Sequence, residues 1–238
     1  MFLDEYAARL EEFRHLPVHL STIHRSLKRA GLSIKRVQKL AKERDPVLCA
    51  NFVHRIGQYN LLCLISIDEV SKDDRTYARL WGRSPVGERA EQHDPFVRKR
   101  RFSMCAAMAL NEGIIASRVI KGSFTHNSFY EYLRDDVLPT TTPYPGPRSV
   151  LILDNARIHH SEEIRELVHS FGCRIEYLPP YSPDYQPIEQ AFSSIKSYLR
   201  RIGLGFYTRE THYYELYEAC TRITPEMTWG FFRHAGYV

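Results

Sequence analysis

The clearest pattern along the chain is a set of short apolar runs separated by segments rich in polar residues. Residues 61–67 (Leu-Leu-Cys-Leu-Ile-Ser-Ile) and 150–153 (Val-Leu-Ile-Leu) are runs of this kind, and their length is that of buried β-strands. The segment Asn111-Glu112-Gly113 has the composition of a tight turn between two further strands. The other strands are expected at 75–81, 101–110, 114–120 and 174–178.

Apolar residues at helical spacing, flanked by capping residues, predict helices between these strands. Ser21 is the expected N-cap and Gly31 the expected C-cap of one short helix, and Ser161 and Gly172 bound another in the same way. Helices are expected near 3–13, 21–31, 45–56, 125–137, 161–172, 188–202, 210–222 and 225–234. Antiparallel strands followed by alternating helices and strands indicate a mixed α/β layer fold.

Three acidic residues stand at the ends of predicted elements. Asp68 follows the apolar run 61–67, Asp154 follows the run 150–153, and Glu189 opens a helix after a proline-rich loop. A carboxylate at the end of a buried strand is fixed by the backbone and reached by solvent. Three such groups brought together would repel one another unless hard cations lay between them, which suits a two-metal site for phosphodiester chemistry.

The segments around these acids resemble the catalytic blocks of the mariner-type superfamily of DDE transposases. Ile67-Asp68-Glu69 resembles the first block, Leu153-Asp154-Asn155-Ala156-Arg157-Ile158-His159-His160 the second, and Tyr181-Ser182-Pro183-Asp184-Tyr185-Gln186-Pro187-Ile188-Glu189 the third. The 34 residues between Asp154 and Glu189 are typical of the branch whose third ligand is Glu. The resemblance covers nearly the whole chain.

This resemblance implies a ribonuclease H-like mixed sheet flanked by helices and preceded by a small helix-turn-helix segment. It implies a cut-and-paste DNA transposase in which Asp68, Asp154 and Glu189 are the catalytic residues and hold two Mg²⁺ or Mn²⁺ ions. It also implies partners: double-stranded DNA, both terminal inverted repeats and TA target sites, bound by a homodimer.

Neighbouring polar residues compete for roles in this site. Glu69 follows Asp68 directly, and successive strand side chains point to opposite faces, so we expect Glu69 to pair locally instead. Asp184 is the competitor of Glu189, but it lies in an irregular loop, whereas Glu189 is on a helix. His159 and His160 either contact the scissile phosphate or pack against the core.

The charge of the chain is concentrated near its beginning. The net charge is +5, whereas residues 21–44 contain eight basic residues and one acid and so carry +7, which leaves −2 for the rest. A localised basic patch is expected of a contact with the phosphate backbone of a nucleic acid. The alternative is a solvated helix face.

The basic segment contains a candidate recognition helix. Ile23 and Leu27 make an inner face, and cations project on the other side, a pattern that resembles the second helix-turn-helix of the paired-type region in this superfamily. A small three-helix cap on the core is the alternative. The predicted DNA-binding residues are Ser21, Thr22, His24, Arg25, Lys28, Arg29, Lys35 and Arg36, with Lys196 and Arg200 on the stripe beside Glu189.

We therefore expect two parts, a partial helix-turn-helix region with a basic linker at 1–44 and a DDE catalytic domain at 45–238. Full-length family members carry two helix-turn-helix units, and this chain has room for only the second. One alternative is thus a domesticated or truncated transposase-derived protein that binds DNA without transposing. Another is a ribonuclease H-like enzyme acting on other nucleic acids.

Composition limits the class of protein and its expected location in the cell. A hydrophobic content of 43% with 12% aromatic residues supports a packed core, and no apolar run reaches the ~18–20 residues of a membrane span. The five cysteines are scattered without CxxC spacing, as in a reduced intracellular protein. We expect a nuclear location in a eukaryote and a cytoplasmic one otherwise; the basic run 98–101 is a candidate DNA contact or import signal.

Overall fold

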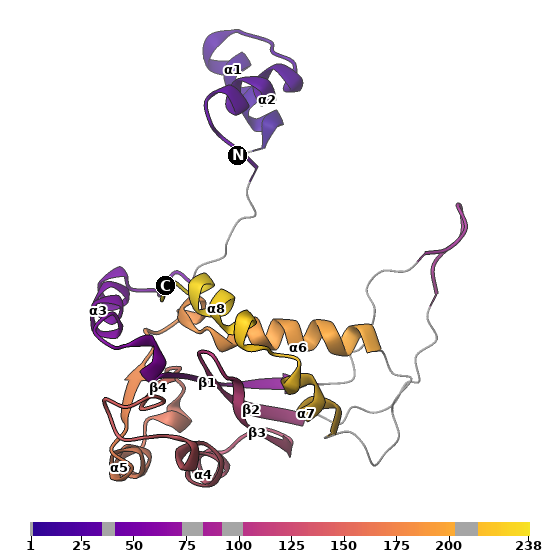
Figure 1. Ribbon diagram of the computed structural model, residues 1–238. Helices are drawn as coiled ribbons and strands as arrows, with labels where there is room; N and C mark the ends of the chain where they lie inside the picture. The colour runs from indigo at the N-terminus through magenta and orange to yellow at the C-terminus, as the bar shows by residue number, and fades with distance from the viewer. Residues whose placement is uncertain (1, 35–40, 73–82, 92–101, 203–213) are drawn as a thin grey trace. The chain divides into compact units, whose positions relative to one another are not determined.

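The computed structural model describes residues 2–34, 41–72, 83–91, 102–202 and 214–238 (Figure 1). The chain divides into two compact units, Met1–Leu40 and Ala41–Val238. Three predicted features lie outside the described residues: the strand at 75–81, the basic run 98–101, and the DNA-binding candidates Lys35 and Arg36.

The first unit contains two helices that pack against each other, α1 (Leu3–Arg14) and α2 (Leu20–Arg29). The prediction that Ser21 is the N-cap of α2 is wrong, because His19 takes that position. The His19 Nδ1 atom accepts the Ser21 backbone N–H at 3.3 Å and lies 2.8 Å from its hydroxyl, which leaves Ser21 inside the helix. Gly31 adopts a positive φ of 78° just past the helix end, as expected of a terminating glycine.

A five-stranded mixed sheet forms the centre of the second unit. Its order is β3-β2-β1-β4-β5. The pairs β1–β2 and β2–β3 are antiparallel, whereas β1–β4 and β4–β5 are parallel. The strands are β1 (Leu64–Lys72), β2 (Phe102–Ala109), β3 (Gly113–Lys121), β4 (Val150–Leu153) and β5 (Arg174–Tyr177). The strands expected at 101–110, 114–120, 150–153 and 174–178 are thereby confirmed.

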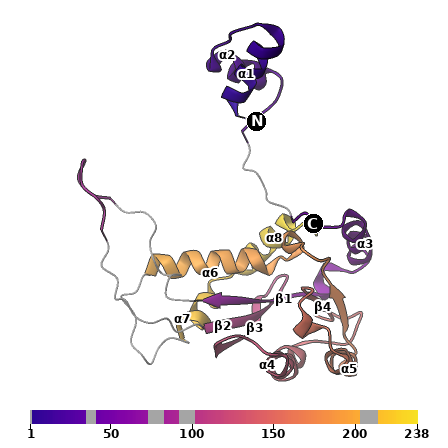
Figure 2. The same ribbon diagram turned by 180° about the vertical axis from the view of Figure 1, so that it is seen from behind.

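Helices cover both faces of this sheet (Figures 1 and 2). One face carries α6 (Ile188–Ile202), α7 (Tyr214–Thr221) and α8 (Pro225–His234), and the other carries α4 (His126–Tyr132) and α5 (Glu162–Ser170). Alternating residues of β1 pack into two separate hydrophobic cores, one on each face of the sheet. Leu64 and Val70 pack on the α6 side, and Ile65 and Ile67 on the α4 side. The alternation follows from the two-residue period of a strand.

Most helix ends lie where the sequence predicts them. Asp45 caps α3 (Pro46–Ile56) by accepting the Val47 backbone N–H at 2.7 Å, and Ser161 caps α5. The helix expected at 125–137 is α4, which continues into a π-helical segment, Leu133–Val137.

All five cysteines are buried and free, as expected of a reduced protein. Among the described residues, no helix has the combination of length and apolar character that would let it cross a membrane.

Candidate active site

The first two predicted catalytic acids lie at the same level on neighbouring parallel strands. The prediction that Asp68 ends a strand is wrong, because β1 continues to Lys72. Ser66 of β1 pairs with Ile152 of β4, and Asp68 and Asp154 each follow two residues later. Asp68 is partly buried, and its Oδ1 atom accepts the backbone N–H of the next residue at 2.7 Å. Asp154 comes one residue after the end of β4, where its side chain, 42% exposed, is free of strand alternation.

A buried glutamine ties the third acidic block to β1. The Gln186 side chain accepts the Ser66 hydroxyl at 2.7 Å and donates to the Ile67 carbonyl at 2.8 Å. The Ser66 hydroxyl also accepts the Ile188 backbone N–H at 3.2 Å, so β1 holds the start of α6 directly. These bonds deliver Glu189, on the first turn of α6, to the end of β1 that carries Asp68. We did not predict Gln186, since a polar residue in a proline-rich loop gives no periodic signal.

Burial and the two neighbouring acids shift the pKa of Asp68. Its pKa is raised from 3.8 to about 8, first because the carboxyl is buried and then because Glu189 and Asp154 lie close by, and this outweighs the opposing effects of the Glu69 amide and His159. Three carboxylates from distant segments therefore gather at one end of the sheet, and the other two make ionisation of Asp68 harder.

The structure adds a histidine that connects two of the acids. His159, only 2% exposed, lies with Nδ1 at 2.6 Å from Asp154 Oδ1 and Nε2 at 3.4 Å from Glu69 Oε1. The contact with Asp154 is a close ion pair rather than an aligned hydrogen bond. Burial disfavours the charged imidazole, but the two carboxylates prevail and raise the pKa of His159 to about 9. Burial likewise opposes ionisation of Asp154, yet His159 and the Ala156 amide hold the pKa of that acid below its ordinary value.

The prediction that Glu69 pairs locally is therefore wrong. Glu69 does share the face of Ile65 and Ile67, opposite to Asp68. Its partner, however, is His159, which is distant in sequence and lies against the same end of the sheet. His160 does not pack in the core, since its exposed ring stacks on Tyr177 at 4.1 Å between centroids.

The competing acid Asp184 forms an ion pair with an arginine. Arg44 contacts both of its carboxylate oxygens, with Nη2 at 2.9 Å from Oδ2, and also lies over the Tyr185 ring at 5.2 Å. A bidentate arginine pair uses the lone pairs that a cation would need. Glu189 thus remains our candidate for the third position.

Predicted DNA contacts that the structure describes lie on exposed surfaces. On α6, Lys196 is partly exposed and Arg200 is exposed, beside the buried stripe that includes Phe192 and Ile195. On α2, the side chains of Ser21, Thr22, His24, Arg25, Lys28 and Arg29 are exposed, while Ile23 is buried.

A hard divalent cation fits the chemistry of the three carboxylates. In the part of the chain that the structure describes, no three His, Cys, Asp or Glu side chains already converge at ligand distances. The carboxyl of Asp68 is buried beside Glu189 and Asp154, which raises its pKa, and carboxylate oxygen is the donor that Mg²⁺ and Mn²⁺ prefer.

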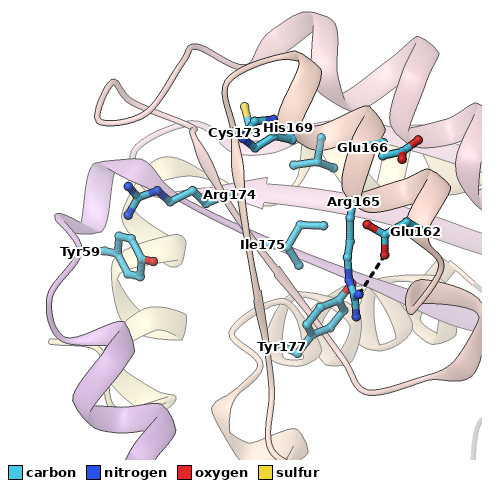
Figure 3. A pocket seen from close by; sticks show the side chains of 10 residues that line it. Tyr59, Glu162, Arg165, Glu166, His169, Cys173, Arg174, Ile175 and Tyr177 are labelled. Atoms are coloured by element: carbon cyan, nitrogen blue, oxygen red, sulfur yellow. Dashed lines mark hydrogen bonds and ion pairs between the residues drawn. The ribbon is translucent and has the colours of Figure 1, made fainter.

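A cavity of about 530 Å³ lies between α5 and β5, beside this site (Figure 3). Arg165 and Tyr177 line it next to each other, and Arg165 pairs with Glu162 at 3.2 Å. The Tyr177 hydroxyl donates to the His159 carbonyl at 2.8 Å. None of the three acids lines the cavity, so it adjoins the candidate active site without containing it.

Comparison with known protein families places the chain in one of them. Residues 63–210 match the model of the DDE superfamily endonucleases, a range that contains Asp68, Asp154 and Glu189. The chain belongs to this family of endonucleases. No curated protein matches it in sequence.

Solved structures with the same fold include complexes of Mos1 transposase. The Mos1 paired-end complex with the left transposon end has a TM-score of 0.66 and 17% identity, over 99% of this chain and 71% of that one. The Mos1 strand transfer complex has a TM-score of 0.68 and 17% identity, over 99% and 70%. The Mos1 catalytic domain with raltegravir and Mg has a TM-score of 0.59 and 17% identity, over 83% and 92%. The ribonuclease H-like fold predicted from the sequence is confirmed.

Proposed function

We propose that this endonuclease is a DNA transposase, which cuts transposon ends and joins them to target DNA. The observation that carries the proposal is the gathering of Asp68, Asp154 and Glu189 at one end of the sheet, where burial and the nearby charges of Glu189 and Asp154 raise the pKa of Asp68 to about 8. Membership of the DDE endonucleases supports the hydrolytic chemistry. The likeness of the fold to Mos1 transposase supports the transposon substrate.

Asp68, Asp154 and Glu189 would hold two divalent cations, Mg²⁺ or Mn²⁺. When bound, such ions polarise a phosphodiester and lower the pKa of an attacking water or 3′-hydroxyl. The similar Mos1 structures include paired-end complexes with Mn and with Mg. Negative charge concentrated on three carboxylates is the property that makes this donor set suitable.

Other residues of the chain position the three candidate ligands and supply positive charge for the DNA. The parallel pairing of β1 with β4 fixes the level of Asp68 and Asp154, and Gln186 fixes the start of α6. Asp68 must release its proton before it can act as a ligand. Lys196 and Arg200, along α6 from Glu189, would contact the DNA backbone and offset the charge on the reacting phosphate.

DNA recognition belongs, in this proposal, to the segment 1–44, with the catalytic domain at 45–238. The exposed cations Arg25, Lys28 and Arg29 of α2 would bind terminal-repeat DNA. A homodimer would hold the two ends together, and the protein would act in the nucleus of a eukaryote or in the cytoplasm of a prokaryote.

Cleavage of a labelled DNA end tests this function. The substrate is a duplex carrying candidate terminal repeats, taken from the sequence flanking the gene, incubated with the protein and Mn²⁺ or Mg²⁺. We expect metal-dependent nicking at the repeat boundary by the wild type and none by Asp154→Asn, while both bind the duplex. Binding without cleavage by the wild type would instead favour a transposase-derived DNA-binding protein, and equal nicking by both proteins would refute the assigned site.

A further inference from the structure

A buried histidine lies directly behind the acid at the end of β4. His159 ends a 3-10 turn, its side chain is 2% exposed, and its ring centroid lies 4.2 Å from that of Phe129. The backbone is held on both sides, because the His159 N–H donates to the Ala156 carbonyl at 3.0 Å and its carbonyl accepts the Tyr177 hydroxyl at 2.8 Å. The imidazole cannot turn away without opening the core around α4.

The ring directs one nitrogen at each of two carboxylates. Nδ1 of His159 lies 2.6 Å from Asp154 Oδ1, and Nε2 lies 3.4 Å from Glu69 Oε1. The Ala156 backbone N–H also donates to Asp154 Oδ1, at 3.0 Å. Both contacts of Asp154 fall on Oδ1, so they hold the carboxylate through one oxygen and leave Oδ2 to serve a cation.

The two acids of β1 approach the end of β4 from opposite sides. Asp68 lies on the α6 side with Glu189, whereas Glu69 follows Ile65 and Ile67 on the α4 side with His159. Asp154 stands beyond the last residue of β4, where both sides can reach it. Glu69 and His159 therefore form a second layer behind the three candidate ligands.

Packing alone does not explain this histidine. An apolar ring would fill the space against Phe129 equally well and would avoid the burial of a polar side chain between two acids. In metal sites, by contrast, ligating carboxylates are held by outer partners whose loss lowers metal affinity about 10–100-fold.

We propose that His159, itself held by Glu69, is a positioning residue that fixes Asp154 for the binding of a divalent cation. The inference rests on the proposed function, since it takes Asp154 as a metal ligand. His159 acts only through Asp154, and Glu69 acts only through His159. A site that sequence analysis limits to three acids thereby acquires two supporting residues.

A matched pair of substitutions separates positioning from packing. The amide nitrogen of Asn can take the place of Nδ1, whereas that of Gln reaches the place of Nε2. His159→Asn therefore keeps an N–H group beside Asp154, and His159→Gln keeps one only beside Glu69. Isothermal titration of the full chain with Mn²⁺, without DNA, measures the affinity of each variant independently of cleavage.

We expect His159→Gln to lose about 10–100-fold in Mn²⁺ affinity and His159→Asn to stay within a few-fold of the wild type. Equal affinities for the two variants, whether both retained or both lost, would overturn the proposal, because the donor toward Asp154 would then have no specific effect. Should either variant fail to fold, as judged by circular dichroism, Glu69→Ala decides the matter. It leaves the ring in place, and an unchanged Mn²⁺ affinity would then refute the positioning chain.

The same titration distinguishes this inference from the proposed function. Loss of Mn²⁺ binding in Asp154→Asn, together with wild-type affinity in His159→Gln, rejects only the positioning role. Equal Mn²⁺ binding by the wild type and Asp154→Asn, or none by the wild type, rejects the metal site itself and the inference with it.

Discussion

Replacing Asp68 by asparagine should stabilise the metal-free protein at neutral and alkaline pH. Asparagine has nearly the same shape and keeps the oxygen that accepts the neighbouring backbone N–H at 2.7 Å. It removes a carboxyl that is buried beside the negative charges of Glu189 and Asp154. The substitution thus measures the combined cost of burying this carboxylate and of placing it beside two other acids.

The sign and size of the effect follow from the linkage between proton binding and the free energy of unfolding. In the folded protein Asp68 holds its proton to about pH 8, whereas its ordinary pKa is 3.8. Between these values the folded state binds more protons than the unfolded state, so the free energy of unfolding decreases as the pH rises. Each pH unit corresponds to about 1.4 kcal/mol, and the whole interval to about 6 kcal/mol. The advantage of Asp68→Asn over the wild type should therefore grow by about 4 kcal/mol from about pH 5 to about pH 8.

Urea unfolding in the presence of a chelator measures this difference at several pH values. A useful control is Asp135→Asn, because Arg134 hydrogen-bonds Asp135 and lowers its pKa. That variant should be less stable than the wild type above the pKa of Asp135, whereas Asp68→Asn should be more stable. If the stabilities of Asp68→Asn and the wild type run parallel across the pH range, neither burial nor the neighbouring acids disfavour the charged Asp68 carboxylate, and the reasoning is refuted.

Three other outcomes bear on the remaining parts of the proposal. Mg²⁺ or Mn²⁺ should raise the thermal midpoint of the wild type and much less that of Asp154→Asn, and equal shifts would count against the site. Replacing Arg25 and Lys28 together by alanine should weaken DNA binding and reduce the salt slope of log K by about 2, measured by fluorescence anisotropy; an unchanged slope would remove α2 from the interface. Gln186→Ala should lower the free energy of unfolding by about 1–3 kcal/mol, because buried polar groups of β1 lose a partner. The same change should weaken Mn²⁺ binding, since Glu189 loses its anchor, and wild-type affinity would contradict that role.

The sequence predicts the layered fold well because its strands and helices have strong local signals. The apolar run at 150–153 gives β4, and the capping residue Ser161 marks the start of α5. The run at 61–67 locates β1 less closely, because Leu61–Cys63 form a 3-10 turn and the strand extends over Leu64–Lys72. The positions of Asp68 and Asp154 follow from the same signals, since each acid directly follows a run of apolar residues.

What the sequence does not predict are contacts between polar residues far apart in the chain. Nothing local in the sequence indicates that His159 lies between Asp154 and Glu69, or that Gln186 bonds to Ser66. Such pairs depend on how the sheet and the loops come together, which periodicity does not encode. The displacement of the α2 cap from Ser21 to His19 has a similar cause, because a histidine ring there competes with the hydroxyl.

The strand order has a consequence for the order of events during synthesis. The neighbours β1, β2 and β3 are consecutive and can pair early, but β4 reaches β1 only after this meander and α4 have been made. The last acid, at the start of α6, leaves the ribosome later still. A nascent chain therefore cannot bring the three candidate ligands together before Glu189 has been translated, 121 residues after Asp68.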